Sequence, residues 1–428
     1  MVTFDQSLDA AIACLLGFYP DIQWQNARII RDMQGTLFVV LPDELAADTA
    51  QLEQVNQAFI QHLEHYVSTA TPVVGFSQTL MGTELLDDPY VIHRYQEHAV
   101  YFIERRAMGE PWLLKPEQVT EPHPPRFVFF SLKGGVGRST ALALWARELC
   151  SQGKTVLVVD MDLEAPGLGA QLLERSGKPL YGVGDWLVED LVGNPAEDLI
   201  ADMAQQSPIV PAGLWVVPAF GSLTDKTPHN MLAKLARAYL DKPTEQGQES
   251  FTVRLQKMLQ ALETQYQPDV VLIDSRAGLH ETVASTLLHL NAEVLCFAVD
   301  LEVTWQGYRY LFSHIAQLAQ HAQPDSDWRD RFKMVSARSD LSRFEHFVGQ
   351  SFGVWSDTLY EDSSGDLGSE FSFDERDEAA PHYPLVIPRS DVFEAFEPCH
   401  DLQGLHEAQI QSVFGAFFTG LAPRLEVI

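Results

Sequence analysis

Positive charge is scarce in this sequence. It has 29 lysine and arginine residues against 59 aspartate and glutamate residues, so its formal net charge is −30. Proteins that bind nucleic acid without sequence specificity, or that lie on anionic membranes, need a basic surface. The only adjacent pair of basic residues is Arg105-Arg106. We therefore see no strong signal for a nucleic-acid partner and none for a membrane.

Cysteines are few, and long apolar runs are absent. No apolar run approaches the roughly 18 to 20 residues that a membrane-spanning helix needs. The first residues, Met1 to Asp5, contain no basic stretch followed by an apolar core, which predicts no secretory signal. The expected location is the cytoplasm, where free thiols are the rule. The four cysteines are scattered without a C-x-x-C pair: Cys14, Cys150, Cys296 and Cys399.

The composition, 46% hydrophobic and 21% charged, is that of a folded protein, and 428 residues suffice for two domains. Residues 1–120 predict a small α+β domain of unknown role. Its four histidines, at positions 62, 65, 93 and 98, lack the cysteine or carboxylate that would complete a convincing metal site. In residues 121–428, strands and helices alternate, which predicts a doubly wound, mostly parallel sheet of the α/β class.

The most informative stretch is 131–140, Ser-Leu-Lys-Gly-Gly-Val-Gly-Arg-Ser-Thr. The apolar run 126–130 before it predicts a buried strand, and 141–149 after it has helix formers with apolar residues at helical spacing. A glycine-rich turn between strand and helix lets N–H groups point inward, and the helix N-terminus adds free N–H groups and its positive dipole end. We predict a phosphate-binding loop, with the Ser139 hydroxyl available to Mg²⁺. The alternative is a chance glycine turn.

Acidic residues follow two further predicted strands. The run 155–159 leads into Asp160 and Asp162, and the run 269–273 leads into Asp274. In open α/β sheets, ligands bind at the carboxyl ends of the strands, so we expect these carboxylates close to the loop. Asp274 would hold Mg²⁺, through water. For the first pair, the alternative is that they cap a helix that starts near Pro166.

The stretch from Lys133 to Ser139 resembles the deviant Walker A loop of the MinD/ParA family of dimeric P-loop ATPases. More narrowly, it resembles a variant group with arginine, here Arg138, where lysine is usual. The segment 160–162 resembles switch I of the family, and 274–278 resembles its Walker B residue and switch II. The resemblance covers about residues 126–425 and leaves out 1–120.

This resemblance implies ATP and Mg²⁺ as cofactors and a homodimer that holds ATP between its subunits. Lys133, the family's signature lysine, would reach the phosphates of the other subunit, and Asp162 would position the attacking water. The implied nucleotide-binding residues are Lys133, Gly134, Gly135, Val136, Gly137, Arg138, Ser139 and Thr140, with Ser336 and Arg338 near the base. The implied metal ligands are Ser139, Asp162 and Asp274, and the implied switch II residues are Asp274, Ser275, Arg276 and Gly278.

Two departures from the family pattern leave alternatives open. An arginine at 138 is longer than lysine and planar; it binds phosphate, but phosphoryl transfer depends on close positioning, so Arg138 as a catalytic group predicts slow hydrolysis. Arg276 stands where the family usually has proline. Its guanidinium would either stabilise charge near the phosphates or form a structural ion pair.

The sequence thus predicts a slowly hydrolysing ATP switch that dimerises around Mg-ATP and signals to a partner protein through the N-terminal domain. One alternative is a non-hydrolysing, nucleotide-gated scaffold, which Arg138 favours and Asp162 disfavours. A second is a DNA-partition ATPase, which the acidic charge disfavours.

Two late segments complete the sequence-based predictions. Residues 356–380 are polar and acidic and predict a flexible insertion in the ATPase domain. Residues 405–421 form an apolar-rich helix without lysine, which we expect to pack against the sheet rather than to bind a membrane.

Overall fold

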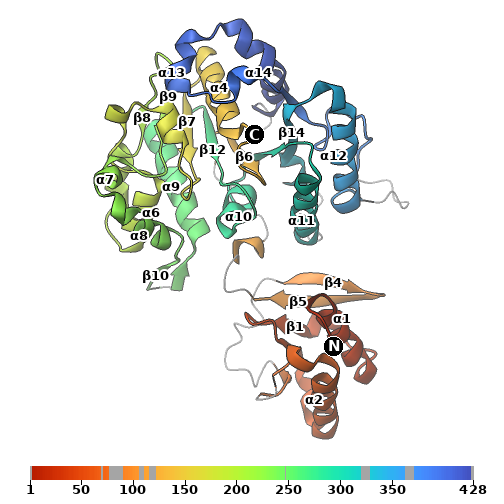
Figure 1. The fold of residues 1–428 in the computed structure, drawn as a ribbon. Helices are drawn as coiled ribbons and strands as arrows, with labels where there is room; N and C mark the ends of the chain where they lie inside the picture. Colours follow the sequence, from red (N-terminus) through yellow and green to blue (C-terminus); the bar gives the residue numbers. More distant parts are fainter. Residues whose placement is uncertain are drawn as a thin grey trace. The chain divides into compact units, whose positions relative to one another are not determined.

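The structure is a computed structural model, and contacts divide it into two compact units, 1–115 and, for the most part, 116–428 (Figure 1). It describes residues 2–68, 71–76, 90–105, 110–114, 122–245, 247–319, 328–361 and 371–425. We describe each unit by itself.

In its described residues, the first unit has a five-stranded sheet and the two helices α1 and α2. The strands run in the order β3-β2-β1-β5-β4; β1 is antiparallel to β2 and parallel to β5, β2 is parallel to β3, and β4 is antiparallel to β5. The elements are α1 (Phe4–Phe18), β1 (Arg28–Arg31), β2 (Leu37–Leu41), α2 (Thr49–Leu63), β3 (Val74–Phe76), β4 (Val91–Tyr95) and β5 (His98–Glu104).

The two helices bury apolar residues at helical spacing in one shared core with the sheet, among them Leu8, Ile12, Val55 and Phe59. Residues 43–47 form a 3-10 turn, and α2 starts after it at Thr49. Among the described residues, no group of three or more His, Cys, Asp or Glu side chains is placed to hold a metal.

The second unit contains an eight-stranded sheet in the order β15-β14-β13-β6-β12-β7-β9-β8. All neighbouring strands are parallel except β8 and β9. The predicted doubly wound, mostly parallel sheet is confirmed. The strands are β6 (Arg126–Ser131), β7 (Val156–Asp160), β8 (Gln205–Gln206), β9 (Leu214–Val217), β12 (Val270–Asp274), β13 (Glu293–Ala298), β14 (Phe332–Ser339) and β15 (Leu385–Pro388).

Helices cover both faces of this sheet (Figure 1). They are α4 (Arg138–Ser151), α5 (Leu168–Leu172), α6 (Val183–Leu191), α7 (Ser222–Lys226), α8 (Met231–Ala238), α9 (Phe251–Tyr266), α10 (Glu281–Leu288), α11 (Glu302–Ala319), α12 (Phe344–Thr358), α13 (Pro398–Asp401) and α14 (Glu407–Leu421). A short hairpin, β10 (Lys242–Thr244) and β11 (Gly247–Glu249), precedes α9.

Central strand β6 shows how the sequence builds both layers. Its side chains alternate in direction: the Phe127 ring packs edge-on against Trp145 of α4 at 4.8 Å between centroids, whereas Phe130 packs against Tyr308 of α11 at 6.3 Å. A strand buried on both faces reads as a continuous apolar run, which is why 126–130 was recognisable from sequence.

The C-terminal helix α14 packs against the sheet as expected, since Phe417 is buried and its ring lies 6.1 Å from that of Phe297 in β13. Among the residues that the structure describes, no helix is long and apolar enough to cross a membrane.

The predicted flexible insertion at 356–380 needs narrower bounds. Residues 356–358 belong to α12, and Phe371 and Ala380 are buried because they pack into the unit. The N–H of Glu361 donates to the carbonyl of Phe371 at 3.1 Å, so the two sides of the segment are joined. Residues 362–370 lie outside the described residues.

Candidate functional site

The turn between β6 and α4 has the backbone of an anion-binding loop. Gly135 and Gly137 have φ values of 75° and 87°, in the left-handed region that favours glycine. The first hydrogen bond of α4 runs from Ala141 N to Gly137 O at 3.0 Å. The N–H groups of residues 138–140 therefore precede the helical ladder and remain available to an anion.

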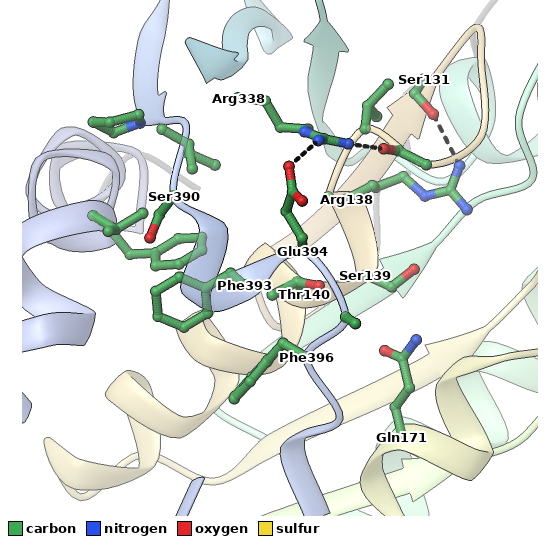
Figure 2. A pocket seen from close by; sticks show the side chains of 18 of the residues that line it. Ser131, Arg138, Ser139, Thr140, Gln171, Arg338, Ser390, Phe393, Glu394 and Phe396 are labelled. Carbon is green, nitrogen blue, oxygen red and sulfur yellow. Dashed lines mark hydrogen bonds and ion pairs between the residues drawn. The ribbon is translucent and has the colours of Figure 1, made fainter. Parts of the chain in front are cut away.

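A cavity of about 450 Å³ lies beside this loop (Figure 2). That volume falls in the range of small-molecule sites. Its walls include the loop residues 134–140, Arg338 near the end of β14, and the segment 387–397, which contributes Phe393 and Phe396. Ser131 of β6, Gln171 of α5, and Val413 and Phe414 of α14 also line the cavity, which lies at the carboxyl end of the sheet.

Arg338 lines this cavity and contacts two of its walls (Figure 2). Its Nη1 donates to the carbonyl of Gly135 at 3.2 Å, and its Nη2 pairs with Glu394 Oε1 at 3.0 Å. Arg338 also has a positive φ of 51°, a conformation that costs energy for a side chain of this kind and persists only where its surroundings enforce it. The contacts tie the loop to the segment that forms the far wall.

A hydroxyl and a carboxylate meet at the start of α4. Ser139 Oγ donates to Asp274 Oδ2 at 2.6 Å. Parallel pairing of β12 with β6 and β7 places Asp274 beside Phe129 and Asp160 at the carboxyl end of the sheet. The structure therefore brings Ser139 and Asp274 together as expected.

The two aspartates after β7 have different surroundings. Asp160 is 1% exposed and accepts hydrogen bonds from the N–H groups of Asp162 and Leu168, both at 3.1 Å. Burial, followed by the charge of Asp274, raises the pKa of Asp160 to about 7. Burial also raises the pKa of Asp162, against the opposing charge of Arg138. Asp160 shapes the turn, and Asp162 faces the site.

Arg138 lines the cavity, but three side chains hold its guanidinium. Its Nε pairs with Asp274 Oδ1 at 2.5 Å, and its Nη2 pairs with Asp162 Oδ2 at 3.3 Å. Its Nη1 donates to Ser131 Oγ at 3.1 Å (Figure 2). Burial alone would lower the pKa of this guanidinium, but the charges and hydrogen bonds of both carboxylates outweigh burial and raise it.

Arg276 forms an ion pair, with Nη1 2.6 Å from Glu164 Oε1. This was one of the two interpretations left open by the sequence. Behind the pair lies Tyr239, whose pKa is raised by burial and then by Glu164. The pair joins the segment after β7 to the segment after β12, the two segments that resemble switch I and switch II.

The remaining predicted residues are spread around the loop. Lys133 is exposed, and Val136 is buried beneath the turn. Ser336 is buried and lines a second cavity of about 520 Å³ on the other side of the loop. The structure therefore does not place Ser336 on the first cavity, which Arg338 does line.

The second cavity gathers basic residues that are far apart in the sequence: Lys133, Arg338, Arg343 and Arg389. Acidic partners offset most of this charge. Glu394 Oε1 lies 3.0 Å from Arg338 and 3.1 Å from Arg389, and Asp300 lies 2.8 Å from Arg343. The cluster is therefore a network of ion pairs rather than a bare basic surface.

Sequence reasoning missed Ser131, Glu164 and Glu394 as site residues. Ser131 had a signal, because it ends the strand that leads into the loop. Glu394 had none, since its partner Arg338 is 56 positions away. Ion pairs between residues so distant in the sequence are recognised only in the folded structure.

No protein-family model and no curated protein matches the sequence. Solved structures are similar to part of this chain. Apo McdA from Cyanothece is 17% identical over 71% of this chain and 100% of its own, with a TM-score of 0.43. The ParA of pNOB8 bound to nonspecific DNA is 16% identical over 71% and 99%, with a TM-score of 0.42. A ParA family ATPase from Chlorobium tepidum is 15% identical over 69% and 98%, with a TM-score of 0.41.

Proposed function

We propose that this chain binds ATP with Mg²⁺ beside the phosphate loop, hydrolyses it slowly, and acts as a dimerising switch that signals to a partner protein. The contact between Ser139 and Asp274, at 2.6 Å, carries the proposal. It places a hydroxyl and a carboxylate, the oxygen ligands that Mg²⁺ prefers, next to N–H groups suited to phosphate.

Ser139, Asp274 and Asp162 fit the hard-oxygen chemistry of a magnesium site, directly or through water. When bound, Mg²⁺ would neutralise charge on the terminal phosphates of the nucleotide. The chain's own groups do the rest. Loop N–H groups bind phosphate, Asp162 accepts a hydrogen bond from the attacking water, and the segment 387–397 encloses the nucleoside.

The exposed position of Lys133 at the start of the loop supports the proposed dimer. An exposed lysine beside a phosphate site has a charge available for a second subunit. The N-terminal unit, 1–115, is proposed to bind the partner protein.

The test is the solution mass of the full chain with and without Mg-ATP, together with ATP turnover. We expect a monomer that becomes a dimer with Mg-ATP, and an Asp162→Ala variant that stays dimeric longer because hydrolysis is lost. Fast turnover of the pure protein without a partner would contradict the slow switch.

The position of Arg138 favours a second candidate, a nucleotide-gated scaffold without hydrolysis. Arg138 Nη2 lies 3.3 Å from Asp162 Oδ2 and forms an ion pair with it. This pair would prevent the Asp162 carboxylate from orienting water. On this scheme ATP drives dimerisation, but Asp162→Ala leaves both the dimer lifetime and the turnover unchanged.

A further inference from the structure

Arg138 occupies a position that a metal ion would need. Its guanidinium contacts Asp274, Asp162 and Ser131 together, and the three charged side chains are only 9%, 3% and 14% exposed for Arg138, Asp274 and Asp162. Both carboxylate oxygens of Asp274 are taken, Oδ1 by Arg138 and Oδ2 by Ser139. A cation is therefore already resident between the two carboxylates.

A guanidinium and a divalent ion cannot share these carboxylates. Two cations a few ångströms apart repel strongly in a site with little water. The planar fork of arginine also satisfies two acceptors at once, which the single ammonium of a lysine does less well. Metal entry thus requires Arg138 to leave.

The adjacent cavity can accept the side chain of Arg138 when it leaves the carboxylates. Arg138 is the first residue of α4, and the loop around it lines the 450 Å³ cavity. If the guanidinium left Asp274 and found no new partner, it would be a poorly solvated charge. An anion in the cavity supplies that partner.

We infer that Arg138 is a resident counter-cation whose release couples metal binding to anion binding. In the protein without nucleotide, it holds Asp274 and Asp162 and excludes divalent metal. A polyphosphate draws it into the cavity, and the two carboxylates then accept the metal. The choice of metal and anion rests on the proposed function, whereas the exclusion of metal rests on the contacts of Arg138 alone. Because the coupling is reciprocal, metal should strengthen anion binding by the same factor.

The experiment measures Mn²⁺ binding without nucleotide, by the loss of the free Mn²⁺ signal in electron paramagnetic resonance. Mn²⁺ serves as the probe because it takes the oxygen ligands of Mg²⁺. We expect the full-length wild type to bind weakly and Arg138→Gln to bind at least about tenfold more tightly, because the competing charge is removed. Arg138→Lys should lie between them.

Three controls isolate the site. Arg147→Gln removes an arginine from the same helix, whose Nη2 lies 2.8 Å from Glu407, and should bind Mn²⁺ as the wild type does. Adding Asp274→Asn to Arg138→Gln should abolish the gain, which separates this site from weak binding elsewhere on an acidic chain. Near-ultraviolet circular dichroism checks the fold; if Arg138→Gln fails to fold, Arg138→Lys decides.

Equal Mn²⁺ affinity in the wild type and the folded position-138 variants would overturn the inference. So would a gain that survives Asp274→Asn. Because no nucleotide is present, these results are independent of whether the protein binds or hydrolyses ATP. Failure of the proposed function would show instead as unchanged mass and turnover with Mg-ATP.

Discussion

Lys333, in β14, is a charged residue in a buried place. It is 4% exposed, and its Nζ donates to the carbonyls of Glu378 at 3.2 Å and Ala380 at 2.7 Å. Burial, and then the charge of Arg424, lower its pKa to about 7, against the opposing effect of nearby carboxylates such as Asp330. These two hydrogen bonds join residues 378–380 to the sheet.

A pH dependence of stability follows. Between about pH 7 and the ordinary lysine value of 10.5, the unfolded chain carries the Lys333 proton and the folded chain does not. The unfolded state then binds more protons, so the free energy of unfolding rises with pH in this window. We expect Lys333 to contribute a rise on the order of a few kcal/mol.

Urea unfolding of wild type and Lys333→Met at several pH values measures this effect. The variant keeps an apolar side chain but cannot titrate. The free energy of unfolding of the wild type should therefore rise relative to that of the variant from pH 7 to 9.5. A constant difference across that range would show that Lys333 keeps its proton in the folded protein.

Gly184 in α6 and Gly353 in α12 are both helical glycines, and their surroundings differ. In α6, a Cβ at Gly184 would lie 2.4 Å from the ring of Phe220, whereas a Cβ at Gly353 in α12 would meet nothing within 4 Å. A helical glycine in open space costs about 0.5–1 kcal/mol relative to alanine. Gly184 is required by packing, and Gly353 is not.

We expect Gly353→Ala to raise the free energy of unfolding by about 0.5–1 kcal/mol. Gly184→Ala should lower it by about 1–3 kcal/mol, because Phe220 must move in a packed core. Urea titrations of the two variants side by side test both signs. Equal effects of the two substitutions would mean that helix propensity alone decides and that the contact with Phe220 is easily relieved.

The helices and strands differ in how readily the sequence predicts them. The central strands β6, β7 and β12 and helix α9 were predictable, because buried parallel strands read as apolar runs and α9 has apolar residues at helical spacing. Strand β4 and helix α12 were not. Strand β4 has no fully buried residue, and α12 contains glycines and aromatic residues that form helices poorly. Helix α12 is stabilised by tertiary packing, as the ring of Trp355 lies 4.8 Å from that of Phe312.

At the scale of the whole molecule, the net charge of −30 is the dominant electrostatic property. Like charges repel within a compact fold, and salt screens them: the Debye length falls from about 30 Å at 0.01 M to about 8 Å at 0.15 M. Of the four basic residues around the second cavity, Arg338, Arg343 and Arg389 are paired with carboxylates. Few unpaired cations offset the repulsion there.

We therefore expect the melting temperature to rise by a few degrees when NaCl increases from about 10 to 150 mM, in scanning calorimetry at pH 7.5. KCl at equal ionic strength should act alike, because the effect is screening rather than ion binding. A melting temperature that falls with salt would show that local ion pairs outweigh the net repulsion.

The sequence by itself determined the glycine-rich loop between β6 and α4, the acidic residues at the strand ends and the class of fold. These are contiguous patterns, in which local propensity and strand order already place the backbone. Only the tertiary structure decided the partners of the long charged side chains. Arg138 pairs with Asp274, 136 positions away, and Arg276 pairs with Glu164, 112 positions away. A guanidinium on a flexible stem can reach several carboxylates, and which one it meets depends on the neighbours that the folded sheet brings within a few ångströms.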